Sequence, residues 1–168
     1  MRCIMATCDV LVIGAGPGGG SAALHAARAG LSVMIVEADP GVGVPVHCGE
    51  CLSHLAVENL DLEIPEEVIA LDCKGIRVIF PDGTDKLLTE PGYVLEKHLF
   101  EKWLVEEATK TGAELFLNHR VKEMTRNFNS DNVFSNWTIN GTGNAFPIEC
   151  KAVIDASGVS GAAAKLLN

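Results

Sequence analysis

The strongest constraint on the fold is a glycine-rich turn between two short apolar runs near the amino terminus. Residues 9–13 (Asp-Val-Leu-Val-Ile) are almost entirely apolar, which is typical of a parallel strand buried on both faces. Small, helix-compatible residues follow over 18–29, and Gly30 offers a helix-ending cap. A second apolar run occupies residues 32–36. A strand, a helix and a strand in so short a stretch predict a βαβ unit with a right-handed crossover.

The glycines of this turn match the dinucleotide-binding fingerprint in the context that gives it physical meaning, between a buried strand and a helix. Gly14 permits a tight turn, Gly16 lets the backbone approach a pyrophosphate, and Gly19 lets the helix pack against the strand. The pyrophosphate would lie at the helix N-terminus. Glu37, which closes the second strand, can accept hydrogen bonds from both hydroxyls of an adenosine ribose. Because a carboxylate disfavours a 2′-phosphate, the sequence favours FAD or NAD over NADP.

The middle of the chain predicts a loop, a hairpin and a helix. Two prolines and three glycines within 38–50 predict a long loop of the kind that is often functional. Apolar runs within 72–89 flank Pro81-Asp82-Gly83, which indicates a hairpin that turns there. We expect an amphipathic helix over 94–111, ended by Gly112. Its expected apolar stripe consists of Leu95, Leu99, Trp103 and Leu104.

The last third of the chain predicts mainly strands. Residues 113–117 have the composition of a buried strand. The segments 121–128, 133–139 and 146–149 suggest an antiparallel meander, with Asn140-Gly141 as a turn signal. A further buried strand is expected at 152–155, before Ser157 and Gly158.

Charge and hydropathy exclude several classes of function. The chain has 168 residues, of which 22 are acidic and 13 basic, so its net charge of −9 would repel nucleic acids and anionic lipid head groups. No stretch approaches the roughly 18 to 20 apolar residues of a membrane span. The start of the chain does not resemble a signal peptide. We therefore expect a cytoplasmic protein, with peripheral contact at the membrane surface left open.

Two of the six cysteines are close enough in sequence to suggest a shared role. Cys48 and Cys51 would suit a redox pair beside a flavin, and with His47 and His54 they would also suit a zinc site. The simplest interpretation is one loop thiol and one buried thiol. The isolated thiols are expected to be small core residues, and they are Cys3, Cys8, Cys73 and Cys150.

Several short segments point together to one family. They are Gly14 to Gly19, Glu37, residues 45–50 (Pro-Val-His-Cys-Gly-Glu), residues 93–97 (Tyr-Val-Leu-Glu-Lys) and residues 155–158 (Asp-Ala-Ser-Gly). This series resembles the geranylgeranyl reductase family of FAD-dependent prenyl reductases. That family includes archaeal digeranylgeranylglycerophospholipid reductases, which saturate the isoprenoid chains of membrane lipids, and relatives that act on geranylgeranyl diphosphate or chlorophyll precursors.

The resemblance implies a fold and a domain plan. We expect a Rossmann-like FAD-binding domain of the glutathione reductase type, with an antiparallel meander and an incomplete substrate domain. Residues 1–168 would form the FAD-binding domain of a truncated two-domain flavoprotein, and 72–92 would begin the inserted sheet of the substrate domain. Family members are about twice as long as this chain, so a missing carboxyl-terminal half or a partner chain is also implied.

The resemblance also implies functional residues. Cys48 and Glu50 are the candidate catalytic residues, and no metal ligand is assigned. The candidate FAD-binding residues are Gly14, Gly16, Pro17, Gly18, Gly19, Glu37, Ala38, Cys48, Gly49, Lys97, Val121, Asp155 and Gly158. Three positions depart from the family, which usually has Arg where His47 and Lys97 stand and Gly where Cys51 stands. Lysine does not reproduce the bidentate fork of arginine.

Three functions remain open from the sequence. The first is FAD-dependent reduction of a prenyl lipid, with ferredoxin or NADPH as the electron donor. The second is a non-catalytic or split nucleotide-binding half-protein that needs a partner chain. The third is a flavoprotein monooxygenase.

Overall fold

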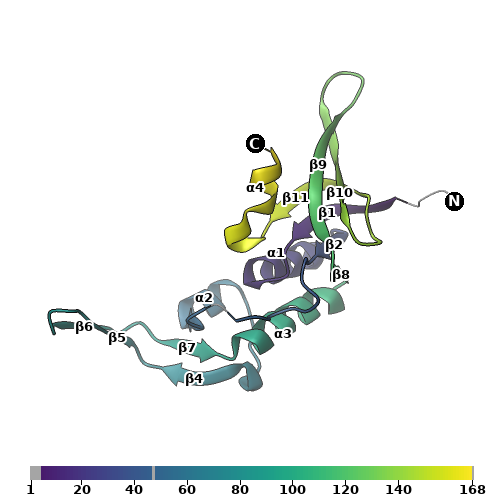
Figure 1. The fold of residues 1–168 in the computed structure, drawn as a ribbon. Helices are drawn as coiled ribbons and strands as arrows, with labels where there is room; N and C mark the ends of the chain where they lie inside the picture. The colour runs from purple at the N-terminus through teal and green to yellow at the C-terminus, as the bar shows by residue number, and fades with distance from the viewer. Residues whose placement is uncertain (1–4, 47, 168) are drawn as a thin grey trace. The chain divides into compact units, whose positions relative to one another are not determined.

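The computed structural model describes residues 5–46 and 48–167. These residues form two compact units (Figure 1). The first unit combines Met1–Val44 with Glu101–Asn168, and the second is the continuous segment Pro45–Phe100. No helix in the described part of the chain is long and apolar enough to cross a membrane.

The first unit is built on a six-stranded sheet with the order β8-β2-β1-β11-β10-β9. Four neighbouring strands are parallel, and they are β8 (Glu114–Phe116), β2 (Val33–Val36), β1 (Ala6–Ile13) and β11 (Ile148–Asp155). The antiparallel strands β10 (Phe134–Thr142) and β9 (Arg120–Phe128) complete the sheet. The predicted Rossmann-like α/β class is confirmed. Most of β1 and all of β2 are buried, as expected for apolar runs at the centre of a parallel sheet. The segment 152–155 of β11 was also expected to be buried, but it is mostly exposed.

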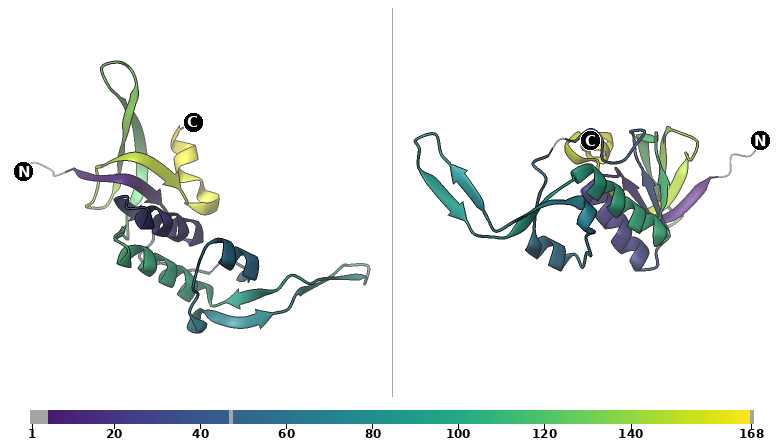
Figure 2. Two further views of the ribbon diagram at one scale, coloured as in Figure 1. Left: turned by 180° about the vertical axis from the view of Figure 1, so that it is seen from behind. Right: turned by 90° about the horizontal axis from the view of Figure 1, so that it is seen from below.

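Helices α1 (Pro17–Arg28) and α3 (Lys97–Lys110) lie side by side (Figure 2). Helix α1 contacts β1, β2 and β11, and a methyl group on Gly20 would lie only 3.0 Å from Leu104 Cγ of α3. The predicted βαβ unit is thus confirmed. Gly30 has a φ of 80° directly after the C-cap of α1, as its expected role requires.

The helix predicted over 94–111 begins later than expected, and its predicted apolar stripe was only partly right. Helix α3 begins at Lys97 because Val94 and Leu95 belong to strand β7 (Gly92–Leu95). Leu99 is 38% exposed. The buried side of α3 instead carries Phe100, Leu104, Val105 and Ala108, a set with helical spacing.

A second layer of core lies on the other face of the central strands, because successive side chains alternate between the faces. Leu11 and Ile13 of β1 join Met34 and Val36 of β2 in this cluster, which also contains Ala163 of the short helix α4 (Ala162–Leu167). The same cluster takes in Cys8 and Cys150, which face each other in register on β1 and β11. Both cysteines are buried, as expected for small core residues, whereas Cys73 is half-buried.

The meander was predicted correctly in outline and wrongly in two details. Asn140-Gly141 is not a turn but lies at an irregularity within β10, where a side chain on Gly141 would collide with the Arg120 carbonyl oxygen. The turn comes later, at Gly143, whose φ is 124°. The segments expected as separate strands at 146–149 and 152–155 are joined in β11.

The second unit contains a three-stranded sheet of β3 (Cys51–Ser53), β7 and β4 (Ile69–Cys73), together with α2 (His54–Asn59) and a 3-10 turn at Glu66–Val68. It also contains the two-stranded hairpin of β5 (Ile76–Ile79) and β6 (Asp85–Leu88), which turns at Pro81-Asp82-Gly83 as predicted. The expected long loop is confirmed, since the described residues between Glu37 and Glu50 form no helix or strand.

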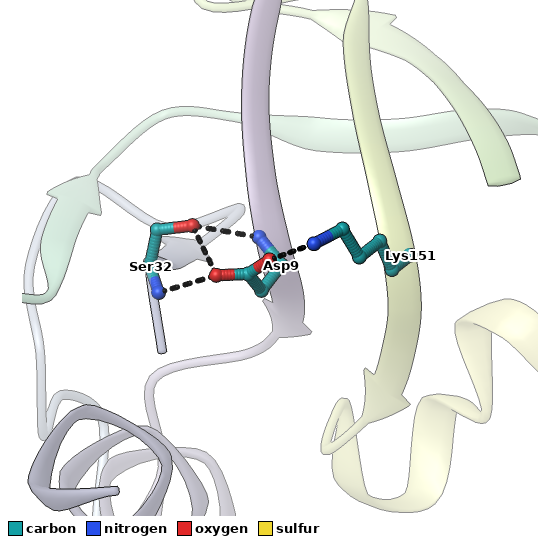
Figure 3. Close-up of polar contacts among 3 residues, drawn as sticks. All are labelled: Asp9, Ser32 and Lys151. Atoms are coloured by element: carbon teal, nitrogen blue, oxygen red, sulfur yellow. Dashed lines mark hydrogen bonds and ion pairs between the residues drawn. The ribbon is translucent and has the colours of Figure 1, made fainter. Parts of the chain in front are cut away.

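A polar cluster ties three central strands together at the amino end of β2 (Figure 3). The carboxylate of Asp9 on β1 accepts hydrogen bonds from the backbone N–H and the hydroxyl of Ser32, at 2.9 and 2.8 Å. Its other oxygen accepts one from Lys151 Nζ of β11, at 2.6 Å. The bond from Lys151 and those from Ser32 hold the pKa of Asp9 far below its usual range.

Candidate nucleotide-binding site

A pocket of about 680 Å³ opens at the carboxyl ends of β1, β2 and β11. This edge of a parallel sheet is where α/β proteins usually bind ligands. The pocket gathers nine of the residues expected to bind the cofactor, namely Gly14, Gly16, Pro17, Gly18, Glu37, Ala38, Val121, Asp155 and Gly158. All of them belong to the first unit.

Two fingerprint glycines are required by the fold itself. Gly14 has a φ of 101°, and a methyl group there would lie 2.5 Å from the Ala156 carbonyl oxygen. A methyl group on Gly19 would collide with the carbonyl oxygen of Gly14. Gly19 therefore allows the first turn of α1 to touch the end of β1, and both glycines have the structural roles that their spacing predicts.

The other two glycines leave room for a ligand. A methyl group on Gly16 or Gly18 would meet nothing within 4 Å, although both residues line the pocket. No side chain caps the amino end of α1, and Pro17 stands at its start. Because the first N–H groups of a helix have no partner within it, this end offers donors and a positive dipole end to an anion. A pyrophosphate fits these features.

Glu37 is held rigidly at the end of β2. Its Oε2 accepts a hydrogen bond from the Ala15 N–H at 2.7 Å, and its Oε1 accepts one from the Asp39 N–H at 2.9 Å. Its own carbonyl oxygen accepts a further bond from the His119 N–H at 2.7 Å. Each carboxylate oxygen retains a second lone pair, so the side chain can still accept hydrogen bonds from ribose hydroxyls.

Asp155 organises the turn that closes the pocket after β11. One oxygen accepts hydrogen bonds from the N–H and hydroxyl of Ser157, and the other accepts the Ala163 N–H of α4 at 2.9 Å. Burial opposes ionisation of this carboxyl, but the hydrogen bonds from Ser157, Ala163 and Ala164 outweigh it and lower its pKa. Gly158, with a φ of 63°, starts the 3-10 turn Gly158–Ser160 that follows.

His119 and Arg120 line the pocket, although no sequence pattern pointed to either residue. His119 is buried, its Nδ1 lies 2.7 Å from the Leu117 carbonyl oxygen, and its Nε2 accepts the Ala145 N–H at 3.0 Å. Since Nε2 accepts a hydrogen bond, the ring proton lies on Nδ1. Arg120 is exposed at the start of β9, and it is the one lysine or arginine among the described residues that line the pocket. Asp39 and Ser160 also line the pocket without having been predicted.

The remaining predicted site residues lie in the second unit, so their roles toward the cofactor remain predictions. The Glu50 N–H donates to Cys48 Sγ at 3.4 Å, and the Cys51 thiol donates to the Gly49 carbonyl oxygen at 3.2 Å. Cys48 and Cys51 are both free and exposed, so the expectation that one of these two thiols is buried was wrong. Lys97 is the first residue of α3.

The zinc alternative finds no support in the described residues. Within 5–46 and 48–167, no group of three or more His, Cys, Asp or Glu side chains is placed to hold a metal ion. His47 and Cys3 lie outside the described residues.

Comparison with known proteins identifies a family. The family described as FAD dependent oxidoreductase matches residues 9–165. A digeranylgeranylglycerophospholipid reductase of Methanothrix thermoacetophila is 35% identical over 163 residues, which are 90% of this chain and 39% of that protein. The protein of the same name from Thermoplasma acidophilum is 40% identical over 120 residues, which are 67% of this chain and 30% of that protein.

Solved structures agree with this result. A geranylgeranyl bacteriochlorophyll reductase-like protein from Thermoplasma acidophilum is 34% identical and superposes with a TM-score of 0.77, covering 90% of this chain and 39% of that one. A p-nitrophenol 4-monooxygenase from Pseudomonas putida shares the fold, with a TM-score of 0.79 at 20% identity, covering 98% of this chain and 44% of that one. This chain thus spans less than half the length of these relatives, and its resemblance to geranylgeranyl reductases is confirmed.

Proposed function

Because the chain belongs to the FAD dependent oxidoreductase family, we propose that its first unit binds FAD for the reduction of isoprenoid double bonds in a prenyl lipid. The observation that supports FAD binding is the free space beside Gly16 and Gly18, next to the uncapped amino end of α1. Glu37 is fixed nearby by its hydrogen bonds. The substrate class is supported by relatives that are named digeranylgeranylglycerophospholipid reductases.

Each part of the pocket has a role in this proposal. The N–H groups at the start of α1 bind the pyrophosphate, and Glu37 orients the adenosine ribose. His119 and Asp155 fix the walls of the pocket through their own hydrogen bonds, at Ala145 and at Ala163 respectively. When it is bound, FAD supplies the hydride that saturates a double bond.

The second unit is proposed to start the substrate side of the enzyme. Residues 72–92, which include the β5–β6 hairpin, would begin the sheet of the substrate domain, and Cys48, Gly49, Glu50 and Lys97 would contact the cofactor or the substrate. Electrons would come from an external donor, either a ferredoxin or NADPH. Because the relatives act on a lipid, we also propose peripheral contact with a membrane.

FAD binding can be tested with a substitution that fills the space proposed for the pyrophosphate. We expect the purified chain to release FAD on denaturation, or to bind added FAD with a visible flavin spectrum. Gly16→Val places a side chain where the pyrophosphate would lie, so it should abolish binding while leaving the circular dichroism unchanged. Gly41→Val is the matched control, because Gly41 is outside the pocket and a methyl group there would make only an ordinary contact, 3.6 Å from Val44. Full flavin retention by Gly16→Val would refute the assignment.

A second candidate is a half-protein that binds FAD but needs the remaining polypeptide for turnover. It is favoured by the chain spanning 39% of the Methanothrix relative. We expect this chain, loaded with FAD and reduced, to saturate a geranylgeranyl lipid only when a second polypeptide is added. That polypeptide would be the part of the Methanothrix relative that this chain does not cover. Turnover by the chain alone would exclude this candidate, and a hydroxylated product that requires oxygen would identify a monooxygenase instead.

A further inference from the structure

The hairpin of β9 and β10 carries exposed aromatic side chains on one face. Both strands continue beyond the other strands of their sheet (Figure 1). Phe128 and Phe134 are 53% and 41% exposed, and their rings meet edge to face with centroids 6.3 Å apart. The Trp137 ring lies 5.7 Å from that of Phe134, and the Arg126 guanidinium lies 5.1 Å from the centre of the Trp137 ring. We call these four residues the aromatic face.

The aromatic face is fixed at its inner end and polar on its back. Trp137 packs against the buried core cluster, so the rings extend outward from the core. On the opposite side of the hairpin, Asn127 Nδ2 donates to Asn136 Oδ1 and to Thr138 Oγ1, both at 2.7 Å. Among the described residues, the hairpin is therefore an amphipathic ribbon whose outer apolar side chains, Phe128 and Phe134, are exposed together, whereas exposed apolar side chains are normally scattered singly.

The charge of this hairpin differs from that of the rest of the chain. Residues 120–142 contain three basic and two acidic side chains, although the whole chain contains 13 basic and 22 acidic ones. Arg126 adds one of these positive charges to the aromatic face itself. A surface that carries phosphate groups above an apolar layer could bind Arg126 through the phosphates and the aromatic rings through the apolar layer. The rest of the chain, which is acidic, would stay in water.

We propose that the aromatic face of the β9–β10 hairpin lies flat on the surface of a phospholipid bilayer. The rings enter the boundary between head groups and acyl chains, where tryptophan and other aromatic side chains are favoured, and Arg126 pairs with lipid phosphate. This inference rests on the proposed function, because a chain of this family that acts on membrane lipids has to meet them at the bilayer. Phosphatidylcholine is the expected surface, since anionic lipids would repel the net charge of −9.

Flotation with phosphatidylcholine vesicles, without added FAD, tests the proposal. We expect the wild-type chain to float with the vesicles and the double variant Phe128→Ser/Phe134→Ser to bind at least about tenfold more weakly. Arg126→Glu should also weaken binding while keeping the rings. In a Trp103→Phe background, Trp137 reports alone, and its fluorescence should shift to the blue when vesicles are added.

Two control variants distinguish vesicle binding by the aromatic face from non-specific binding of exposed apolar side chains and from FAD binding. Met5→Ser/Leu31→Ser removes two exposed apolar side chains of the first unit that lie outside the aromatic face, and it should leave vesicle binding unchanged. Gly16→Val should also bind vesicles normally, so failure to bind FAD and failure to bind lipid are distinguishable. The proposal is overturned if the wild-type chain does not float, or if Met5→Ser/Leu31→Ser loses vesicle binding and the Phe128→Ser/Phe134→Ser variant does not. It is also overturned if the aromatic face proves to hold two copies together, with the Phe128→Ser/Phe134→Ser variant eluting as a monomer and the wild type as a dimer.

Discussion

A methyl group on Gly14 would meet the Ala156 carbonyl oxygen, whereas one on Gly16 would point into open space. The same motif therefore contains one glycine that folding requires and one that a ligand requires. We expect Gly14→Ala to destabilise the chain by about 3 kcal/mol, because it combines a positive φ with a clash against backbone. Thermal unfolding followed by circular dichroism measures this effect.

Gly16→Ala serves as the comparison for that prediction. It should change the free energy of unfolding by less than about 0.5 kcal/mol, since it strains nothing in the protein. It should nevertheless weaken FAD binding, which titration of flavin fluorescence measures. Equal stability losses in the two variants would contradict this division of roles.

Arg120 offers a second test at the scale of the residue. It is exposed at the pocket, where Glu37, Asp39 and Asp155 are all acidic. We expect Arg120→Ala to weaken FAD binding by about tenfold, through the loss of a guanidinium able to stack on a base or pair with phosphate. Arg120→Lys separates these two modes, because lysine keeps the charge and loses the planar fork. Unchanged affinity in Arg120→Ala would show that its side chain does not reach the ligand.

At the scale of elements, the cluster of Asp9, Ser32 and Lys151 joins β1, β2 and β11 through one carboxylate (Figure 3). The pKa of Asp9 is lowered and that of Lys151 is raised, each chiefly by their mutual hydrogen bond. A lowered carboxyl pKa stabilises the fold above the unfolded value of about 4, and a raised amine pKa stabilises it below about 10.4. The Asp9–Lys151 pair therefore stabilises the fold between these two pH limits, and this stabilisation is lost as pH falls or rises beyond them.

The variant Asp9→Asn tests this pH dependence. Its Tm should lie a few degrees below that of the wild type near neutral pH. The gap in Tm should narrow as pH falls below about 4, where Asp9 of the unfolded chain begins to take up a proton, and again above about 10.4, where Lys151 of the unfolded chain begins to lose one. A gap that stayed constant from acid to alkaline pH would mean that the hydrogen bonds to Ser32 matter and the charges do not.

The elements that the sequence predicted well are those with local signals. The βαβ unit and the β5–β6 turn follow from apolar runs and turn residues that are adjacent in the chain. Asn140-Gly141 was wrongly predicted to be a turn. A glycine is needed at 141 because the backbone of Arg120 on the neighbouring strand comes close to it, and not because the chain turns there. His119 and Arg120 reach the pocket only because β8, the segment before them, pairs with β2, and no local pattern reports such a pairing.

At the scale of the whole molecule, the two units differ in how much core they have. Among the described residues of the second unit, those buried and apolar are Leu62, Val68, Leu95 and Phe100, whereas the first unit buries most of β1 and β2. Small units with little buried surface are marginally stable. We expect amide hydrogens of β5 and β6 to exchange orders of magnitude faster than those of β1 and β11 in hydrogen exchange measured by mass spectrometry. Uniform protection across both units would contradict this expectation.

The pairing of β1 with β11 has a consequence for biosynthesis. Ala6 is in register with Ile148 and Ile13 with Asp155, so the strand that leads into the fingerprint lies against one made much later. On the ribosome, β1 leaves the exit tunnel long before this neighbour exists, and one of its edges stays open in the meantime. The nucleotide pocket, which needs Asp155 as well as Gly14, is complete only after β11 has emerged. FAD can therefore be loaded only after β11 has left the ribosome, and until then the unpaired edge of β1 is open to pairing with other chains.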